Sequence, residues 1–338
     1  MPLPHLLILE SIHIAHAQTL QLTVQNNDVA DITVIGAPYW IDFIEIFAQD
    51  GNVRMQRIEG HSIPLDMRKQ FSTQELARLI GVTGPDLGTV ILAAGEQRDF
   101  FLPFNSIIDT TEMFVAGLNG DLIYRFHFRA GTDILAGGAA PPTMNSLSLI
   151  IHTIELPPRR FRETLNLFRN GTFDYPYLFQ VRQALTQTFN PGTTYNFVLS
   201  GLTGLVSFMH INMRATPLQN VAFFTYEKLD SFNILSESGH TITGLQKIDA
   251  DYNIRVQQTL WGFPGESTVD NYLYAHSRAP INDIGTGSNL GFFAYTGKEQ
   301  LQIITPSTMV AGNKELEVIA YVHGLLRINK GVARVILS

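Results

Sequence analysis

The sequence contains no cysteine, few charged residues and no long apolar run. Without cysteine among its 338 residues, the chain has no disulfide, no thiolate metal site and no cysteine nucleophile, and its redox compartment stays undetermined. No apolar stretch approaches the ~20 residues that a helix needs to cross a bilayer. Charged residues make up 16% and hydrophobic ones 45%, so the groups that normally coat a free monomer are scarce. We therefore expect partners to cover much of the surface.

Positive charge is also scarce. The net charge is -7 and the sequence pI is about 5.8, whereas neutralising phosphates requires clustered Lys and Arg. The one basic cluster, Arg159, Arg160 and Arg162, is followed directly by Glu163. This argues against a protein that binds nucleic acid independently of sequence, and we expect no direct sequence-specific contact with nucleic acid either.

Alternation of apolar and polar residues predicts strands along most of the first half of the chain. Asp50-Gly51 and Asn119-Gly120 are hairpin signals, because the central residues of tight hairpin turns need positive φ. The capping box Ser72-Thr73-Gln74-Glu75 predicts one inserted helix, Ser72 to Gly81. The predicted strands are Thr19–Val24, Ile32–Ile35, Tyr39–Phe47, Val53–Ile58, Thr89–Ala93, Phe100–Phe104, Met113–Gly117, Leu122–Phe128 and Leu147–Leu156.

In the middle of the chain the spacing of the apolar residues changes from that of a strand to that of a helix. Pro157 and Pro158 end the preceding strand, because proline cannot continue a strand ladder. Phe161, Leu165 and Phe168 then recur at helical spacing, and Asn170-Gly171 predicts a left-handed stop. We interpret this stretch as a helical joint between two β domains; the alternative is a surface helix inside one domain.

The second half repeats the strand pattern over nearly the same length. Its predicted strands are Thr194–Leu199, Leu205–Met213, Val221–Leu229, Ser231–Leu235, Tyr252–Gln257, Asn271–His276, Gly291–Tyr295, Leu301–Ile304, Glu315–Ile328 and Val332–Leu337. About eight strands in each half predict an all-β protein of two tandem eight-stranded jelly rolls with a few short inserted helices. The expected limits are 1–156 for the first roll, 157–171 for the joint and 172–338 for the second.

No residue pattern marks a catalytic, cofactor or metal site. His127, His152, His210 and His323 lie in predicted strands, where a packed or surface histidine is commoner than a metal ligand. The glycine-rich stretch 285–291 precedes a strand rather than a helix, which disfavours a phosphate loop. Two carboxylate pairs in predicted loops, Glu96 with Asp99 and Asp249 with Asp251, are the nearest candidates for acid–base chemistry. We predict no catalytic, cofactor-binding or metal-binding residue.

Adjacent phenylalanines are more informative. Phe100-Phe101, Phe223-Phe224 and Phe292-Phe293 lie in predicted strands, where successive side chains point to opposite faces. One ring of each pair should therefore face outward. An outward ring needs cover from a loop or from another subunit, and the second possibility indicates assembly.

The order of these parts resembles the double jelly-roll major capsid proteins of tailless icosahedral viruses, many of them phages with an internal membrane. The resemblance lies in the first roll with its helix at Ser72–Gly81, the proline-marked joint at Pro157–Gly171, and a second roll that ends the chain. It covers the whole chain and rests on architecture, length and composition.

The resemblance implies a structural virion protein rather than an enzyme. It implies homotrimers that form pseudo-hexagonal capsomers, a lattice of these trimers, contacts with minor capsid or vertex proteins, and assembly in the host cytoplasm. An internal lipid membrane as a further partner stays open, and no cofactor is implied. The alternatives are a tandem jelly-roll hydrolase and a carbohydrate-binding or adhesin protein. A protein of the second kind usually exposes Trp and Tyr rings on which sugars stack, and this chain has two tryptophans, Trp40 and Trp261.

Overall fold

The computed structural model describes residues 5–9, 14–70, 75, 79, 88–242, 248–253, 272–277 and 292–337. The chain forms two compact units. One holds the described residues of Met1–Phe179 and His323–Ser338, and the other those of Gln180–Asp283 and Ser288–Val322. Strands β11 (Thr172–Phe189) and β19 (Gly312–Asn329) contribute residues to both units. The predicted limits 1–156, 157–171 and 172–338 stay a prediction.

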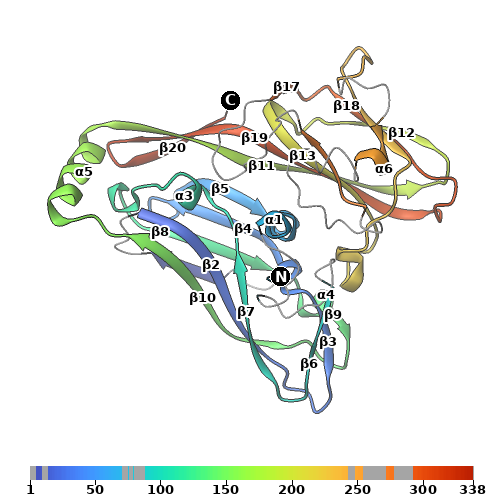
Figure 1. Cartoon of the computed structure of the whole chain (residues 1–338), viewed down its shortest axis with the longest axis horizontal. Helices are drawn as coiled ribbons and strands as arrows, with labels where there is room; N and C mark the ends of the chain where they lie inside the picture. Colours follow the sequence, from blue (N-terminus) through green and yellow to red (C-terminus); the bar gives the residue numbers. More distant parts are fainter. Residues whose placement is uncertain are drawn as a thin grey trace. The chain divides into compact units, whose positions relative to one another are not determined.

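The first unit contains three antiparallel sheets, whose strands run side by side in Figure 1. The four-stranded sheet has the order β1 (His5–Leu9), β8 (Leu122–Phe128), β4 (Ile41–Ala48), β5 (Val53–Glu59). A three-stranded sheet has the order β10 (Thr143–Ile154), β2 (Ile14–Gln25), β7 (Gln97–Pro103). A smaller sheet has the order β6 (Thr89–Leu92), β3 (Ile32–Ile35), β9 (Leu135–Gly137).

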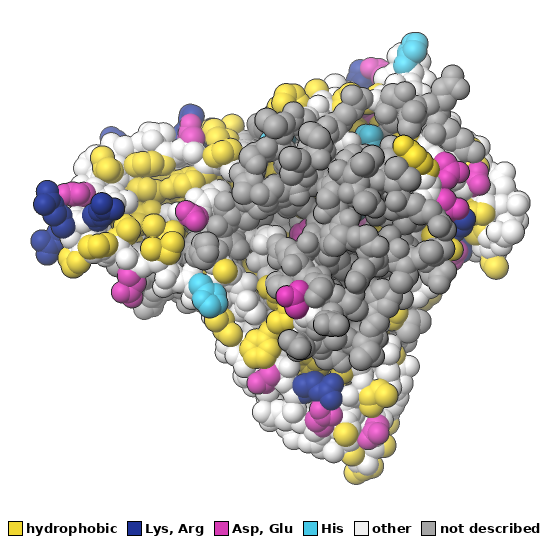
Figure 2. Space-filling view, viewed as in Figure 1, with side chains coloured by type: hydrophobic (Ala, Val, Ile, Leu, Met, Phe, Trp, Pro, Cys, Tyr) yellow, Lys and Arg dark blue, Asp and Glu magenta, His cyan; other side chains and the backbone are white. Residues whose placement is uncertain are grey.

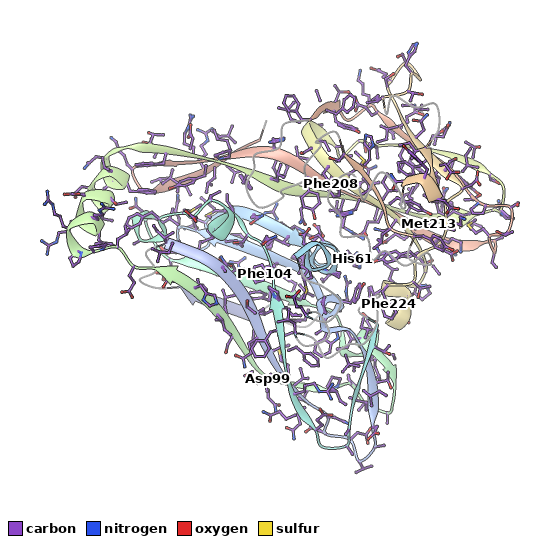
Figure 3. The ribbon with its side chains drawn as sticks, in the orientation of Figure 1. His61, Asp99, Phe104, Phe208, Met213 and Phe224 are labelled. Carbon is purple, nitrogen blue, oxygen red and sulfur yellow. The ribbon has the colours of Figure 1, made fainter. Side chains whose placement is uncertain are left out.

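Aromatic side chains from different sheets meet in the core of this unit. Phe104, just after β7, packs edge-on against Tyr124 and Phe126 of β8, with ring centroids 6.5 and 6.2 Å away (Figure 3). Trp40 lies 5.2 Å from Phe100 of β7, and its indole N–H donates to the Ile35 carbonyl at 2.7 Å. The indole is therefore buried with its one polar atom satisfied.

Short helices interrupt the strands. They are η1 (Ala37–Trp40), α1 (Ser62–Gln70), α3 (Ile107–Thr110), η2 (Val115–Gly117), α4 (Gly131–Ile134), α5 (Pro158–Asn170), η3 (Asn220–Phe223) and α6 (Ala250–Tyr252). Among the helices of the described residues, none is long and apolar enough to cross a membrane.

The second unit contains two more antiparallel sheets, and Val332–Leu337, which pairs with the larger of them, belongs to the first unit. The larger sheet has the order β11, β19, β13 (Thr203–Ala215), β16 (Tyr274–Ser277); β17 (Phe293–Thr296) also pairs with β13, and β20 (Val332–Leu337) pairs with β19. The smaller sheet has the order β12 (Thr194–Val198), β18 (Gln300–Ile304), β14 (Ser231–Leu235), β15 (Ile248–Asp249). Phe232 of β14 packs 5.9 Å from Tyr274 of β16, which joins the two sheets.

The structure confirms the all-β prediction and corrects it in several places. Met113–Gly117 is not a strand: only Phe114 bridges Ile14, and the following residues form η2. Successive residues Met113 and Phe114 are both buried, so this apolar run fills a compact turn instead of alternating between two faces. Val221–Leu229 likewise folds into η3 and a turn, with a single bridge from Tyr226 to Arg214.

Other differences concern the joint and its neighbours. α5 occupies the predicted joint, but Gly171 is extended at φ -107° rather than left-handed. A Cβ there would still meet the Leu167 carbonyl at 2.7 Å. The 18-residue strand β11 was not predicted, although Phe173, Tyr175, Tyr177 and Phe179 alternate along it; Pro176 weakens the strand signal.

Two predicted elements lie largely outside the described residues. Of the helix Ser72–Gly81, only Glu75 and Leu79 are described, and both are helical. Tyr252, expected to begin a strand, lies in α6, and residues 254–257 are outside the described part.

A buried charge cluster ties β13 to β19 in the second unit. Arg214 of β13 is 1% exposed and donates to Glu315 and Glu317 of β19, both at 2.9 Å. Asn212 donates to Glu317 at 3.2 Å, and Arg182 of β11 contacts the same two carboxylates. The register sets these contacts, because Arg214 stands opposite Glu315 and Asn212 opposite Glu317.

This cluster gives a first prediction. Arg214→Met should lower the free energy of unfolding by roughly 3–5 kcal/mol, because buried Glu317 and partly buried Glu315 would lose the Arg214 guanidinium and keep only the half-buried Arg182 as an ionic partner. Chemical denaturation measures the change. The control is Lys298→Met in the same unit. Lys298 forms an ion pair with Glu237 in which both side chains are exposed, and this pair should contribute at most about 1 kcal/mol to stability. Equal effects of the two variants would contradict a structural role for the buried cluster.

Candidate functional site

The first carboxylate pair is engaged in structural bonds. Glu96 accepts the Ala93 N–H at 2.7 Å and pairs with Arg98 at 2.6 Å. Asp99 lies within β7, not in a loop, and accepts the Thr23 hydroxyl at 2.7 Å (Figure 3). Burial raises the pKa of Glu96, but the Ala93 N–H and the Arg98 guanidinium outweigh it, and the pKa is lowered overall. A carboxylate held in its ionised form is a poor general acid near neutral pH.

The second carboxylate pair also has structural roles. Asp249 belongs to β15 and caps α6, where its side chain accepts the Tyr252 N–H at 2.9 Å. Asp251, in the first turn of α6, pairs with Lys228 at 3.1 Å near the surface. The structure therefore assigns these acids to a helix cap and a surface ion pair.

Of the four histidines in predicted strands, His127, His210 and His323 are at least half-buried, and His152 of β10 is exposed. The His127 ring stacks on Phe43 with centroids 4.0 Å apart, and His210 packs edge-on against Phe208 at 4.5 Å. His323 is half-buried, and burial lowers its pKa. In the part of the chain that the structure describes, no group of three or more His, Asp or Glu side chains could hold a metal ion. The stretch 285–291 and Trp261 lie outside the described residues.

The prediction that one ring of each adjacent phenylalanine pair faces outward is confirmed in part. Phe100 is buried and Phe101 half-buried on β7, as alternation requires. Phe223 is buried and Phe224 is not, but they belong to η3 and the turn after it. Phe292, next to β17, is 55% exposed.

The joint helix α5 is anchored by aromatic rings within the first unit. Phe168, the buried residue of α5, stacks on Phe173 with centroids 4.2 Å apart and contacts Phe114 at 5.2 Å. Phe161 contacts Phe114 at 5.7 Å. A Cβ on Gly117 would lie 2.5 Å from the Phe168 ring, so only glycine leaves room for it. These rings fix which face of α5 points outward.

The outward face of α5 carries basic side chains. Arg159, Arg160, Arg162 and Arg169 are all exposed. Figure 2 shows Lys and Arg side chains gathered at the position of α5. Arg159 pairs with Glu163 one turn later at 3.0 Å, at the surface. Leu167, also on α5, is 62% exposed.

Strand β10, which leads into α5, forms an uncovered sheet edge. It pairs with β2 along one side and ends the order β10-β2-β7, so its other side has no strand partner among the described residues. Its 12 residues, TMNSLSLIIHTI, contain no Asp, Glu, Lys, Arg or Pro. Leu147, Leu149 and Ile151 are half-buried and Ile150 is exposed. Free monomers usually protect such an edge with charge or proline, so this edge is suited to pairing with another chain.

Two antiparallel β units in one chain are the arrangement of a double jelly roll. No protein-family model matches the sequence, and no curated protein matches it either. The likeness is found in solved structures.

Three of these structures show the likeness. VP54 of PBCV-1, fitted into a reconstruction of the virophage Sputnik, has a TM-score of 0.69 and 13% identity, covering 98% of this chain and 92% of that one. The Faustovirus major capsid protein has a TM-score of 0.64 at 9% identity, with 97% and 88% covered. The mavirus major capsid protein has a TM-score of 0.52 at 10% identity, with 98% and 86% covered. The chain therefore has the fold of double jelly-roll major capsid proteins.

The aromatic anchor of α5 gives a second prediction. Phe168→Ala should destabilise the first unit by roughly 3–5 kcal/mol, because it leaves a cavity between Phe114 and Phe173. The neighbouring variant Leu167→Ala removes an exposed side chain and should change stability by about 0.5 kcal/mol or less. Thermal and urea unfolding compare the two. A Phe168 variant as stable as the Leu167 variant would show that the rings do not anchor the helix.

Proposed function

We propose that this protein is the major capsid protein of an icosahedral virus and acts in a structural rather than an enzymatic role. The observation that carries the proposal is the double jelly-roll fold, shared along 97–98% of this chain with PBCV-1 VP54 and the Faustovirus major capsid protein. The carboxylates that a hydrolase would need are engaged in a cap and in ion pairs.

In this proposal the chain forms homotrimers. Two similar rolls per chain give a trimer six rolls, which approximates a hexagon, and a pseudo-hexagonal capsomer of this kind can tile an icosahedral lattice. Such trimers would contact one another and minor capsid or vertex proteins in a virion assembled in the host cytoplasm. An internal membrane would be a further partner. The scarcity of charged residues and the charge-free edge of β10 support a surface made for contacts between copies.

The mass of the protein in solution tests the proposal directly. Light scattering after size exclusion should give about 113 kDa, three times the 37.7 kDa chain, and negative-stain images of the same peak should show hexagonal outlines. A protein that stays monomeric at high concentration would contradict the capsomer.

The β10 edge supplies a residue-level test of assembly. Ile150→Lys places a charge on an exposed face of the edge strand and should shift the protein from trimer to folded monomer. The control, Val29→Lys, changes a 95% exposed apolar residue in a turn and should leave the trimer intact. Light scattering reports the mass, and circular dichroism checks that both variants fold. An unchanged trimer with Ile150→Lys would remove β10 from the interface.

A further inference from the structure

α5 concentrates positive charge in an acidic chain. It holds four of the 23 Lys and Arg residues within 13 positions, and its one carboxylate is Glu163. Four arginines and one glutamate give the helix a formal charge of +3, whereas the whole chain carries -7. The helix is thus a local exception to the electrostatic character of the protein.

The helix is held with this charge outward. Phe168 and Phe161 point into the aromatic cluster, and at 100° per residue Arg159 falls on the opposite side of the helix from Phe168. Arg160 and Leu167 fall close together on one flank, and Arg162 and Arg169 on the other. The exposed surface therefore combines arginines with an uncovered leucine.

The turn between β19 and β20 lies next to the end of α5. The Lys330 N–H donates to the Gly171 carbonyl at 2.9 Å, and exposed Val332 follows it. This turn adds a lysine and a second uncovered apolar side chain to the same end of the first unit, and Figure 1 shows α5 close to this turn. We call α5 together with Lys330 and Val332 the basic end.

The acids around the basic end are mostly engaged. Asp174 pairs with Arg327 at 2.7 and 2.8 Å, and this contact lowers the pKa of the carboxyl. Asp50 accepts the Asp121 N–H at 2.8 Å. In the turn that holds Asp50, the Gln49 side chain donates to the Ala333 carbonyl, and in the turn that holds Asp121, the Asn119 N–H donates to the Gly331 carbonyl. Neither of these hydrogen bonds is made to α5. The arginines of α5 therefore face solvent with Glu163 as the one carboxylate of their own helix.

We propose that the basic end docks onto a surface of anionic lipid headgroups. Clustered arginines beside exposed apolar side chains are the composition of a helix that lies in a membrane interface, where cations meet headgroups and apolar groups enter the acyl boundary. A nucleic-acid backbone would use the arginines but would leave Leu167 and Val332 without cover. The inference rests on the proposed capsid function, in which an internal membrane is a partner.

Vesicle flotation tests the inference with the full-length protein. At 0.1 M NaCl the wild type should float with vesicles of phosphatidylcholine containing 30% phosphatidylglycerol and should not float with phosphatidylcholine alone. Arg159→Gln, Arg160→Gln and Arg162→Gln combined should weaken binding by about two orders of magnitude. Leu167→Ser should weaken it several-fold and leave its salt dependence unchanged, because it removes apolar rather than electrostatic attraction.

A second triple variant controls for net charge. Arg54→Gln, Lys228→Gln and Lys298→Gln remove three surface cations elsewhere, each now paired with a carboxylate. The change in net charge is the same, and vesicle binding should stay within about threefold of the wild type. An equal loss in both triples would overturn the inference, because binding would then follow overall charge.

The remaining outcomes separate this inference from the capsid proposal. A wild-type trimer that does not bind anionic vesicles overturns the lipid inference alone. If that trimer binds double-stranded DNA through the same arginines, the basic end is a nucleic-acid contact instead. A monomer that floats with anionic vesicles supports the lipid inference and overturns the capsomer.

Discussion

The structure depends on one constraint: an antiparallel sheet with one apolar face must be covered by a second sheet. In the first unit this cover brings Phe104 against Tyr124 and Phe126, and in the second it brings Phe232 against Tyr274. Burial of such rings removes large apolar areas from water, which is the main favourable contribution to folding. The short helices and turns follow from it, since they connect strands whose positions are already set. α5 is attached by the same means, through Phe161 and Phe168 on Phe114.

Covering the faces of a sheet leaves its edge strands without a partner on one side, and such an edge strand can pair with another chain. β10 ends a sheet with 12 residues that carry no formal charge, whereas β11, the edge of another sheet, carries Asp174, Pro176 and Arg182. The two edges therefore differ in how readily they accept another strand. The proposed capsid role would account for this difference, because a lattice needs reproducible contacts between copies. The same proposal would account for the low content of charged side chains.

The likeness to viral capsid proteins at 9–13% identity has a physical basis. A jelly roll requires alternation of apolar and polar residues, turns at suitable positions and enough buried volume, and many sequences meet these requirements. Specific side chains are constrained mainly where space or charge is critical. Gly117 under the Phe168 ring and Arg214 between Glu315 and Glu317 are such positions in this chain. The fold can therefore persist after most residues have changed.

The sequence by itself determined the all-β class, most strands, the hairpin at Asp50-Gly51 and the helix at Pro158–Asn170, because periodicity and turn chemistry are local properties. It could not distinguish Met113–Gly117 from a strand, since apolar residues fill a buried turn as well as a ladder. β11 was not predicted from the sequence, because Pro176 weakened the strand signal of the alternating aromatic residues around it. Only the tertiary structure decided which strand became the uncovered edge, and only it brought Lys330 next to Gly171 from the far end of the chain. Strand order and such long-range neighbours depend on packing between segments distant in sequence, which no local pattern encodes.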